Sequence, residues 1–420
     1  MKCYSFLEIY QHAKKHSAFY QDLYKNLSET PKIEELPLID SQKFWPMNSP
    51  NQNRILTGPQ NDGIVFKSGG TSGNAKFSYF SKEEWQSLTA IFGEGMSRAA
   101  IRDGERVANF FYAGDLYASF IFIMKAIEAS DRKVIQLPLS GAADIESIVK
   151  IVNEFKVDVW AGPPTTLMKI AEHIAHAKAY APRKVLFGGE SFYPDQRMHL
   201  SSLFPGVEIL SIGYASVDGG HIGFSDPSCG PEEHRVFSKY SIIEIIDADT
   251  LKPIEEVGKR GKLVLTNLTR KLMPIIRYPV GDLGEWIETK DIKIERKFRI
   301  LGRSEEGARV GPTTLYYDDL ASFLHKYQTQ LGSTGFQLII RHFDKLDQLV
   351  IRIAKTTQGK IEANELLEHL EVERPLCKDL VHDKKMHRVS IEFVKPEDLS
   401  SNLRTGKLKR IIDERFGSHK

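Results

Sequence analysis

The segment from Glu84 to about Ile222 alternates stretches of helical periodicity with short apolar runs, and this alternation restricts the fold more than any other feature. Amphipathic stretches such as Asp144–Phe155 and Thr165–His176 separate the apolar runs. Strands that alternate with helices in this way form βαβ units, so we expect a mostly parallel sheet with helices on its faces. The predicted strands are Arg106–Phe111, Lys133–Leu137, Val157–Ala161, Lys184–Phe187 and Glu208–Ile212.

The pattern changes twice after this segment. From about Val236, strands joined by turns predominate and predict a β-rich subdomain with strands at Ser241–Ile246, Lys262–Leu265, Gly284–Glu288 and Lys293–Leu301. After Gly302 an α+β pattern begins, with helices at Tyr317–Leu331 and Ile361–Leu370 and strands at Gly335–Arg341, Gln348–Ala354 and Ser390–Phe393. The basic tail from Arg404 to Phe416 is predicted to be helical in its second half.

At 420 residues the chain is longer than one hydrophobic core usually supports. We therefore expect an α/β protein with a large domain, residues 1–302, and a small α+β domain, residues 303–420.

Composition excludes several functional classes. Lys and Arg total 57 against 55 Asp and Glu, a balance that argues against a nucleic-acid or membrane partner. The longest apolar stretch, around Tyr117–Met124, is too short to span a membrane. The three cysteines are far apart, which suggests neither a disulfide framework nor a zinc ribbon. We expect a cytoplasmic enzyme that acts on small molecules, as a monomer or a homodimer.

The segment from Ser68 to Lys76 has the composition of a phosphate-binding loop. Its three glycines let backbone N–H groups approach a polyphosphate, and its hydroxyls and the Lys76 ammonium offset the charge. The spacing is not that of a Walker A loop, and taken alone the segment fits a flexible surface loop equally well. The residues expected to contact phosphate are Ser68, Gly69, Gly70, Thr71, Ser72, Gly73 and Lys76.

Other segments follow this loop in a characteristic order. They are Gly188–Glu190, Gly213–Gly220, Arg277–Asp282, Phe298–Glu306 and Thr405–Arg410. Together with Ser68–Lys76 they resemble, in chain order, the motifs of adenylate-forming enzymes: acyl-CoA synthetases, aryl-CoA ligases and peptide synthetase adenylation domains. Within that superfamily the chain resembles phenylacetate–CoA ligase over nearly its whole length, with further matching segments at His16–Tyr20, Leu36–Asp40, Leu268–Arg270 and Met273–Tyr278.

The resemblance implies a nucleotide site between an adenylation domain and a mobile C-terminal lid. Tyr214 would stack on the adenine, and Asp282 would accept the ribose hydroxyls. Besides the phosphate loop, the residues implied to bind ATP or AMP are Gly189, Glu190, Tyr214, Ala215, Ser216, Asp282 and Arg303.

Three further roles follow from the same resemblance. Asp218 would hold Mg²⁺, a cation that prefers hard oxygen ligands. Lys407 would be the catalytic lysine, which reaches the carboxylate and the α-phosphate, although Lys409 lies close in sequence. Glu305 would be the hinge residue about which the lid turns.

The acid's pocket is implied by family analogy alone. Its candidate residues are Tyr112, Tyr117, Trp160, Gly162, Gly188 and Tyr214, of which the aromatic ones suit the core of a protein equally well. Cys229 and His234 also invite a zinc interpretation, but two candidate ligands without evident partners favour it only weakly.

The implied activity is ATP- and Mg²⁺-dependent activation of a carboxylic acid, aromatic by analogy, to an acyl-adenylate, followed by transfer to coenzyme A. The adenylation motifs describe only the first half-reaction, so transfer to an acyl carrier protein or a reductase stays open. A degenerate relative that binds nucleotide without catalysis is the third interpretation, because Val217 and Pro279 replace the usual motif residues.

Overall fold

The structure is a computed structural model. It describes residues 2–68, 76–190, 192, 194–247, 250–290, 295–303, 307–310, 313–344, 346–355, 360–382, 384, 386–402 and 406–415.

The predicted parallel sheet is present. Its strands are ordered β4-β3-β5-β6-β7 and run parallel throughout. Their bounds are β3 Arg106–Asn109, β4 Ile135–Leu137, β5 Val159–Gly162, β6 Lys184–Phe187 and β7 Glu208–Ser211. Each predicted strand therefore overlaps an observed one.

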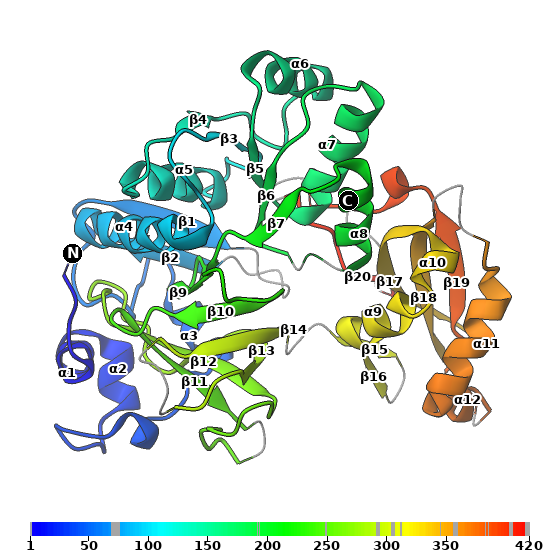
Figure 1. Ribbon diagram of the computed structural model, residues 1–420. Coiled ribbons are helices and arrows are strands. Elements are labelled where there is room, and N and C mark those ends of the chain that lie inside the picture. Colours follow the sequence, from blue (N-terminus) through cyan, green and yellow to red (C-terminus); the bar gives the residue numbers. More distant parts are fainter. Residues whose placement is uncertain are drawn as a thin grey trace.

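Helices cover both faces of this sheet (Figure 1). Because successive side chains of a strand point to opposite faces, Val159 and Ala161 pack with α4 Lys82–Ala99 and α5 Ser119–Ala129, whereas Trp160 packs with the helices of the other face. Those helices are α6 Ile145–Phe155, α7 Pro164–His176 and α8 Pro194–Leu203.

The predicted β-rich region is a seven-stranded sheet ordered β11-β12-β13-β14-β10-β9-β8. Its strands are β8 Tyr214–Ser216, β9 Gly220–Phe224, β10 Glu233–Val236, β11 Ser241–Ile246, β12 Gly261–Asn267, β13 Tyr278–Trp286 and β14 Lys297–Arg303. The prediction of a strand at Gly284–Glu288 was wrong in its start. The strand begins at Tyr278. Pro279 and Gly281 suggest a turn in the sequence, but here they belong to a strand that pairs with β12 on one side and β14 on the other, and β-bulges interrupt both pairings.

The amino-terminal elements pack against this sheet in one shared hydrophobic core. They are α1 Phe6–His16, α2 Ala18–Leu23, η1 Ile33–Glu35, α3 Ser41–Phe44 and η2 Trp45–Met47. A hairpin of β1 Ile64–Ser68 and β2 Lys76–Phe80 follows, and it flanks the glycine-rich loop.

The carboxyl-terminal part is α+β, as predicted. It has a hairpin of β15 Gly307–Val310 and β16 Thr313–Tyr316, and a four-stranded sheet ordered β19-β18-β17-β20. The bounds of that sheet are β17 Ser333–Phe343, β18 Leu346–Lys355, β19 Ser390–Val394 and β20 Ile411–Asp413. The remaining elements are α9 Tyr317–His325, α10 Gln328–Leu331, α11 Ala363–Glu373, α12 Pro375–His382 and η3 Pro396–Asp398.

Two local predictions in this part were wrong. The helix predicted at Tyr317–Leu331 ends at His325 and a separate short helix begins at Gln328. The tail is not helical where the structure describes it: Ile411–Asp413 form β20, which pairs in parallel with Leu338–Ile340 of β17. A ladder partner distant in sequence thus outweighs the local helical tendency.

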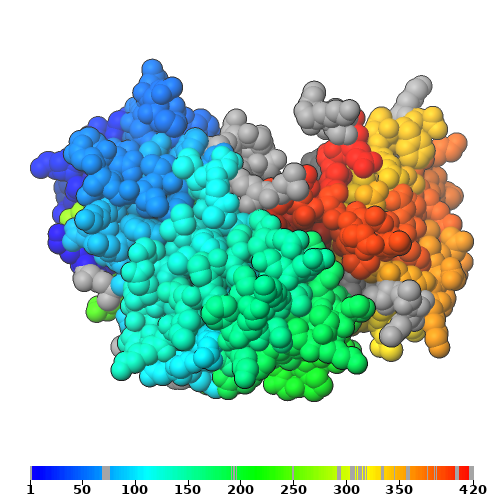
Figure 2. Space-filling view, turned by 90° about the horizontal axis from the view of Figure 1, so that it is seen from above, coloured from blue at the N-terminus to red at the C-terminus, as the bar shows by residue number. Residues whose placement is uncertain are grey.

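The two parts are in contact, and Figure 2 shows residues of the carboxyl-terminal part, in red, lying against the segment coloured green. The predicted boundary at residue 302 falls in β14, which belongs to the large part, and it stays a prediction. None of the helices formed by described residues is long and apolar enough to cross a membrane.

Candidate active site

The carboxyl edge of the parallel sheet gathers most of the predicted site. Parallel strands all end at one edge, and the segments that follow β3, β5, β6 and β7 begin with Phe110, Pro163, Gly188 and Ile212. Tyr112, Thr165, Glu190 and Tyr214 therefore come from four different crossovers to the same side of the sheet. Ligands of open α/β sheets bind at such an edge.

Asp218 lies between the two ends of the glycine-rich loop. Ser68 Oγ, at the end of β1, donates to Asp218 Oδ1 (2.8 Å), and Lys76 Nζ, at the start of β2, is 3.6 Å from Asp218 Oδ2. The side chain of Asp218 is 14% exposed and that of Lys76 is 28% exposed, so both remain accessible. A carboxylate, a hydroxyl and an ammonium thus meet where the loop begins and ends.

A hydrogen-bond network that the sequence did not suggest holds the Asp218 carboxylate. Tyr278 O–H donates to Asp218 Oδ2 (3.0 Å), and the indole N–H of Trp45 donates to the Tyr278 hydroxyl (3.3 Å). Burial, with a further contribution from the Asp218 charge, raises the pKa of Tyr278 well above its ordinary value. The phenol therefore stays protonated and keeps donating. Lys76 Nζ also lies 5.3 Å from the centre of the Trp45 ring, within cation–π range.

Arg270 fixes the backbone of the same residue. It is fully buried over the Phe80 ring and donates to the carbonyl oxygens of Asp218 (2.7 Å) and Tyr79 (3.0 Å). Burial lowers the pKa of Arg270 to about 10, so the guanidinium remains charged at neutral pH.

The donor set at Asp218 fits Mg²⁺. Among the described residues, no group of three or more His, Cys, Asp and Glu side chains is arranged to hold a metal ion. Mg²⁺ does not need such a cage, because it is usually held by one or two carboxylates together with substrate phosphates and water. Asp218 offers one partly exposed carboxylate beside the phosphate loop, as that mode of binding requires.

Tyr214 and Asp282 are in direct contact. The Tyr214 hydroxyl donates to Asp282 Oδ2, and the Tyr214 ring packs against those of His234 and Phe298. Ala215 and Ser216 continue β8 after Tyr214, and Ser216 Oγ accepts from the Gly219 N–H (2.9 Å), so it caps its own turn. The structure therefore brings together the residues predicted to bind the adenine and the ribose.

Lys407 comes from the other end of the chain and lies against Gly189. A Cβ added at Gly189, whose φ is +81°, would be 3.0 Å from Lys407 Cε and 3.2 Å from Lys407 Nζ. Glycine at this position therefore both adopts the left-handed conformation and leaves room for the lysine side chain.

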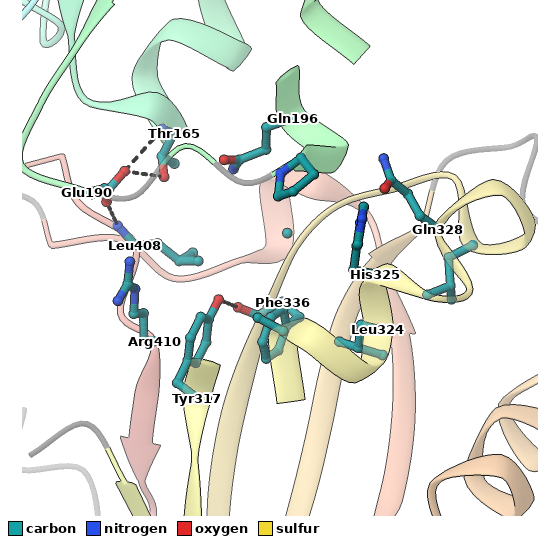
Figure 3. Close-up of a pocket in the computed structure, with 14 residues that line it drawn as sticks. Thr165, Glu190, Gln196, Tyr317, Leu324, His325, Gln328, Phe336, Leu408 and Arg410 are labelled. Carbon is teal, nitrogen blue, oxygen red and sulfur yellow. Dashed lines mark hydrogen bonds between the residues drawn. The ribbon is translucent and has the colours of Figure 1, made fainter. Parts of the chain in front are cut away.

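Glu190 and Leu408, which follow Gly189 and Lys407 in the sequence, are also in contact (Figure 3). The backbone N–H of Leu408 donates to Glu190 Oε1 (2.7 Å), while Glu190 Oε2 accepts from the N–H (3.1 Å) and the hydroxyl (2.8 Å) of Thr165. Gly406, at φ +66°, packs on the Tyr112 ring so closely that an added Cβ would be 2.0 Å from Tyr112 Cε2. Thr165 was not predicted, because its role appears only when its helix is placed beside Glu190.

The predicted acid-pocket residues divide into two groups. The Tyr112 hydroxyl lies between Thr166 Oγ1 (3.1 Å) and the Gly141 carbonyl (3.2 Å), and burial raises its pKa. Tyr117 is buried beside the same segment. Trp160, however, is fully buried between Phe110 and Phe204 in the core of the opposite sheet face, and Gly162 and Gly188 are packed closely by side chains. Trp160 therefore lies in the core and not at an open surface.

Some predicted residues lie outside the described part of the chain. They are Gly69, Gly70, Thr71, Ser72, Gly73 and Glu305, together with the side chain of Arg303. The backbone of Arg303 pairs with Asp282 across β13 and β14.

Cys229 and His234 have separate neighbours. His234 Nε2 is 2.8 Å from Ser211 Oγ, and burial lowers the pKa of His234 to about 4, which keeps the ring neutral. The Cys229 thiol contacts Asp226 (3.5 Å), and burial raises its pKa to about 11.

We expect Tyr278→Phe to weaken both the fold and the metal site. The change removes the donor to Asp218 and leaves the buried Trp45 N–H without its acceptor, so the free energy of unfolding should fall by about 1–3 kcal/mol. Urea denaturation measures this loss, and ATP–pyrophosphate exchange measures the Mg²⁺ concentration needed for half-maximal rate, which should rise. Tyr20→Phe is the matched control, because the buried Tyr20 hydroxyl donates to the Pro274 carbonyl (2.8 Å) and not to Asp218. An equal shift in Mg²⁺ dependence in both variants would contradict the assignment.

Comparisons with known proteins find sequence relatives and solved structures of similar fold. No family model matches the chain. Over 264 residues it is 25% identical to the indoleacetate–lysine synthetase of Pseudomonas savastanoi, covering 59% of this chain and 58% of that enzyme, so the match spans little more than half of the synthetase. It is 23% identical to the phenylacetate–coenzyme A ligase of Thermus thermophilus, covering 80% of this chain and 76% of the ligase.

Among solved structures, 2-hydroxyisobutyryl-CoA ligase is similar over nearly the whole chain. In its postadenylation state with 2-HIB-AMP it gives a TM-score of 0.72 at 18% identity and covers 98% of this chain and 89% of that one. In its thioesterification state with CoA, at 17% identity and with 97% and 89% covered, the TM-score is 0.62. Both likenesses show that this chain has the fold of that ligase.

Proposed function

We propose, on the premise that this chain is a phenylacetate–CoA ligase-like member of the adenylate-forming superfamily, that it uses ATP to convert a carboxylic acid to an acyl-adenylate and then transfers the acyl group to an acceptor. The observation that carries this proposal is the contact of Lys407 with Gly189. It brings a lysine from the carboxyl-terminal part to the edge of the sheet that Tyr214 follows, and Tyr214 in turn contacts Asp282.

The first half-reaction needs charge compensation more than a protein nucleophile. A carboxylate oxygen of the substrate attacks the α-phosphorus, the bond to the bridging oxygen of the β-phosphate breaks, and pyrophosphate leaves. Two anions must meet, so positioned cations lower the barrier. Lys76 would offset charge at the phosphates, and Lys407 would do so between the carboxylate and the α-phosphate. Mg²⁺ held at Asp218 would add neutralisation of the polyphosphate.

The second half-reaction transfers the acyl group from AMP to the acceptor. With coenzyme A as the acceptor, the sulfur attacks the acyl carbon, AMP leaves, and the thiol proton passes to solvent or a base. We place the domain boundary after residue 302 and the hinge at Glu305. Rotation of residues 303–420 would withdraw Lys407 and admit the acceptor.

A second candidate acceptor is an amine, which would give an amide. The specific support is the similarity to indoleacetate–lysine synthetase, whose name describes an amide-forming reaction. Transfer to an acyl carrier protein or a reductase uses the same first half-reaction. The acid itself we propose to be aromatic, because Tyr112, Tyr117 and Tyr214 lie at or next to the edge that would hold it.

A panel assay tests the proposal. The protein is incubated with ATP, Mg²⁺ and separate aromatic, aliphatic and amino acids, and pyrophosphate release is measured without an acceptor, with coenzyme A and with lysine. We expect release that depends on aromatic acids, and mass spectrometry of the product distinguishes a thioester from an amide. Binding of ATP without release for every acid class would contradict the proposal and favour a nucleotide-binding protein without catalysis.

A further inference from the structure

We propose that Glu190 is a positioning residue: it fastens the segment Gly406–Arg410, here called the lysine segment, to the large part in the arrangement used for adenylation. The fastening must break before acyl transfer. This inference rests on the proposed function and adds to it a device that holds one of the two arrangements.

The first step of the argument is the geometry of the Glu190 carboxylate. One oxygen accepts two hydrogen bonds from Thr165, in the first turn of α7, where a negative charge also interacts favourably with the helix dipole. The other oxygen accepts the N–H of Leu408. The carboxylate is therefore anchored in the large part and offers its remaining oxygen to the small part (Figure 3).

The second step is that Gly189 and Glu190 contact Lys407 and Leu408 in turn, so two consecutive residues of one part contact two consecutive residues of the other. Gly189 provides space for the Lys407 side chain, and Glu190 binds the amide that directly follows Lys407. A hydrogen bond to a carboxylate is stronger than one between neutral groups and is directional. The bond at Leu408 therefore fixes the backbone position from which the lysine side chain extends.

The third step is that the lysine segment is firmly attached to its own side. The fully buried Gln337 of β17 donates to the carbonyls of Ser400 (2.8 Å) and Lys409 (2.7 Å), and the Leu338 N–H donates to the Arg410 carbonyl (2.8 Å). The segment thus moves with β17, and its bond to Glu190 is a contact between the two parts.

The fourth step concerns the surroundings of this contact. Beyond Glu190 the two parts line a cavity of about 50 Å³, partly open to solvent, between α7 and α8 on one side and α9, α10 and β17 on the other. Its walls include Gln196, Tyr317, His325 and Phe336. Glu190 and Leu408 both line this cavity, so their hydrogen bond spans a place where the two parts are not closely packed.

Glu190→Gln tests the proposal. A glutamine has one accepting oxygen, so its NH₂ group must face either the Leu408 N–H or the Thr165 N–H, and one contact is lost. We expect the kcat of ATP–pyrophosphate exchange to fall by about 10- to 100-fold, because the lysine is misplaced. The resemblance implies a nucleotide contact for Glu190, but both of its oxygens are bonded to Thr165 and Leu408 here. The KM for ATP and the rate of acyl transfer from a synthetic acyl-adenylate should therefore stay within about twofold of wild type. Glu172→Gln is the matched control, because Glu172 is an exposed carboxylate on α7 that contacts His199 and not the lysine segment.

A second measurement needs no catalysis. Met198 of α8 and Gln328 of α10 face each other across the joint, with Met198 Sδ and Gln328 Nε2 3.7 Å apart. With Met198→Cys and Gln328→Cys in a Cys3→Ser, Cys229→Ser background, a short bis-maleimide should cross-link the two parts, and Glu190→Gln should lower the yield. An unchanged yield overturns the proposal. So does a raised KM for ATP with unchanged kcat, or an equal loss in both half-reactions. If wild-type protein adenylates no acid but the yield still falls, the fastening stands and the proposed function fails.

Discussion

Replacing Lys407 with alanine is expected to lower the rate of acyl-adenylate formation by about 100- to 1000-fold, the usual effect of removing one positioned donor from a developing charge. ATP–pyrophosphate exchange, measured with the acid that the panel identifies, reports this step. Transfer from a synthetic acyl-adenylate should change little, because in the proposed mechanism Lys407 leaves the site before the acceptor enters. The two half-reactions should therefore separate in this single variant.

The reason for so large an effect lies in what else surrounds the acid and the α-phosphate. Lys76 is paired with Asp218 at the base of the phosphate loop, and Arg270 is fully buried beneath the same residue. Neither Lys76 nor Arg270 can replace the ammonium group of Lys407, which comes from the carboxyl-terminal part and lies next to Gly189. Removing Lys407 leaves the approach of two anions without its compensating charge on that side.

Lys409→Ala provides the control for this prediction. Lys409 lies two residues further on. Its side chain is exposed, and its backbone bonds to Ser400 and Gln337. The variant keeps the net charge of Lys407→Ala but should keep its exchange activity within about twofold of wild type. Equal losses in both variants would show that the tail acts through general positive charge, and exchange unaffected by Lys407→Ala would remove the lysine from the mechanism.

The parallel sheet could be predicted closely, because its strands are buried on both faces. The run Lys184–Phe187 is β6 with the same bounds, and Thr165–His176 differs from α7 only by the preceding proline. Such strands appear as continuous apolar runs between helices, a local signal that needs no knowledge of the partner strand. The antiparallel sheet gave a weaker signal, since β13 contains Pro279 and Gly281 and depends on its neighbours for its strand conformation.

The carboxyl-terminal tail depends even more on a partner strand for its conformation. Ile411–Asp413 has no pattern that distinguishes a strand from the end of a basic helix, and it is a strand because β17 offers an open edge. That edge was formed by residues more than sixty positions earlier in the chain. Short segments whose conformation comes from such partners cannot be assigned from periodicity alone.

The candidate site also contains residues with a sequence signal and residues without one. Lys76, Asp218, Asp282 and Lys407 belong to motifs with a recognisable order, so they could be proposed from the sequence. Trp45 carries no comparable signal, yet it lies beneath Lys76 and binds the tyrosine that supports Asp218. Gln337 is a similar case, because a glutamine in a strand has no distinguishing context until the lysine segment is placed beside it.

Cross-linking Met198→Cys to Gln328→Cys should produce a protein that still adenylates but no longer transfers. The cross-link would hold α8 and α10 at the separation seen here, in which Lys407 contacts Gly189. Because the adenylation arrangement is retained, ATP–pyrophosphate exchange should stay within about twofold of the unlinked protein. In the proposed mechanism the small part must turn before the thioester or amide can form. Formation of that product should therefore fall below detection, while the acyl-adenylate accumulates on the enzyme.

The proof that the constraint causes this loss is its reversal. A linker that contains a disulfide, cut by a reducing agent, should restore transfer to the rate of the untreated double variant, and each single-cysteine variant treated in the same way should transfer normally. Transfer at full rate in the linked protein would mean that the acceptor reaches the acyl carbon without any rotation. In that case the contact between Glu190 and Leu408 could persist throughout the reaction, and Lys407 would have to serve both half-reactions from one position.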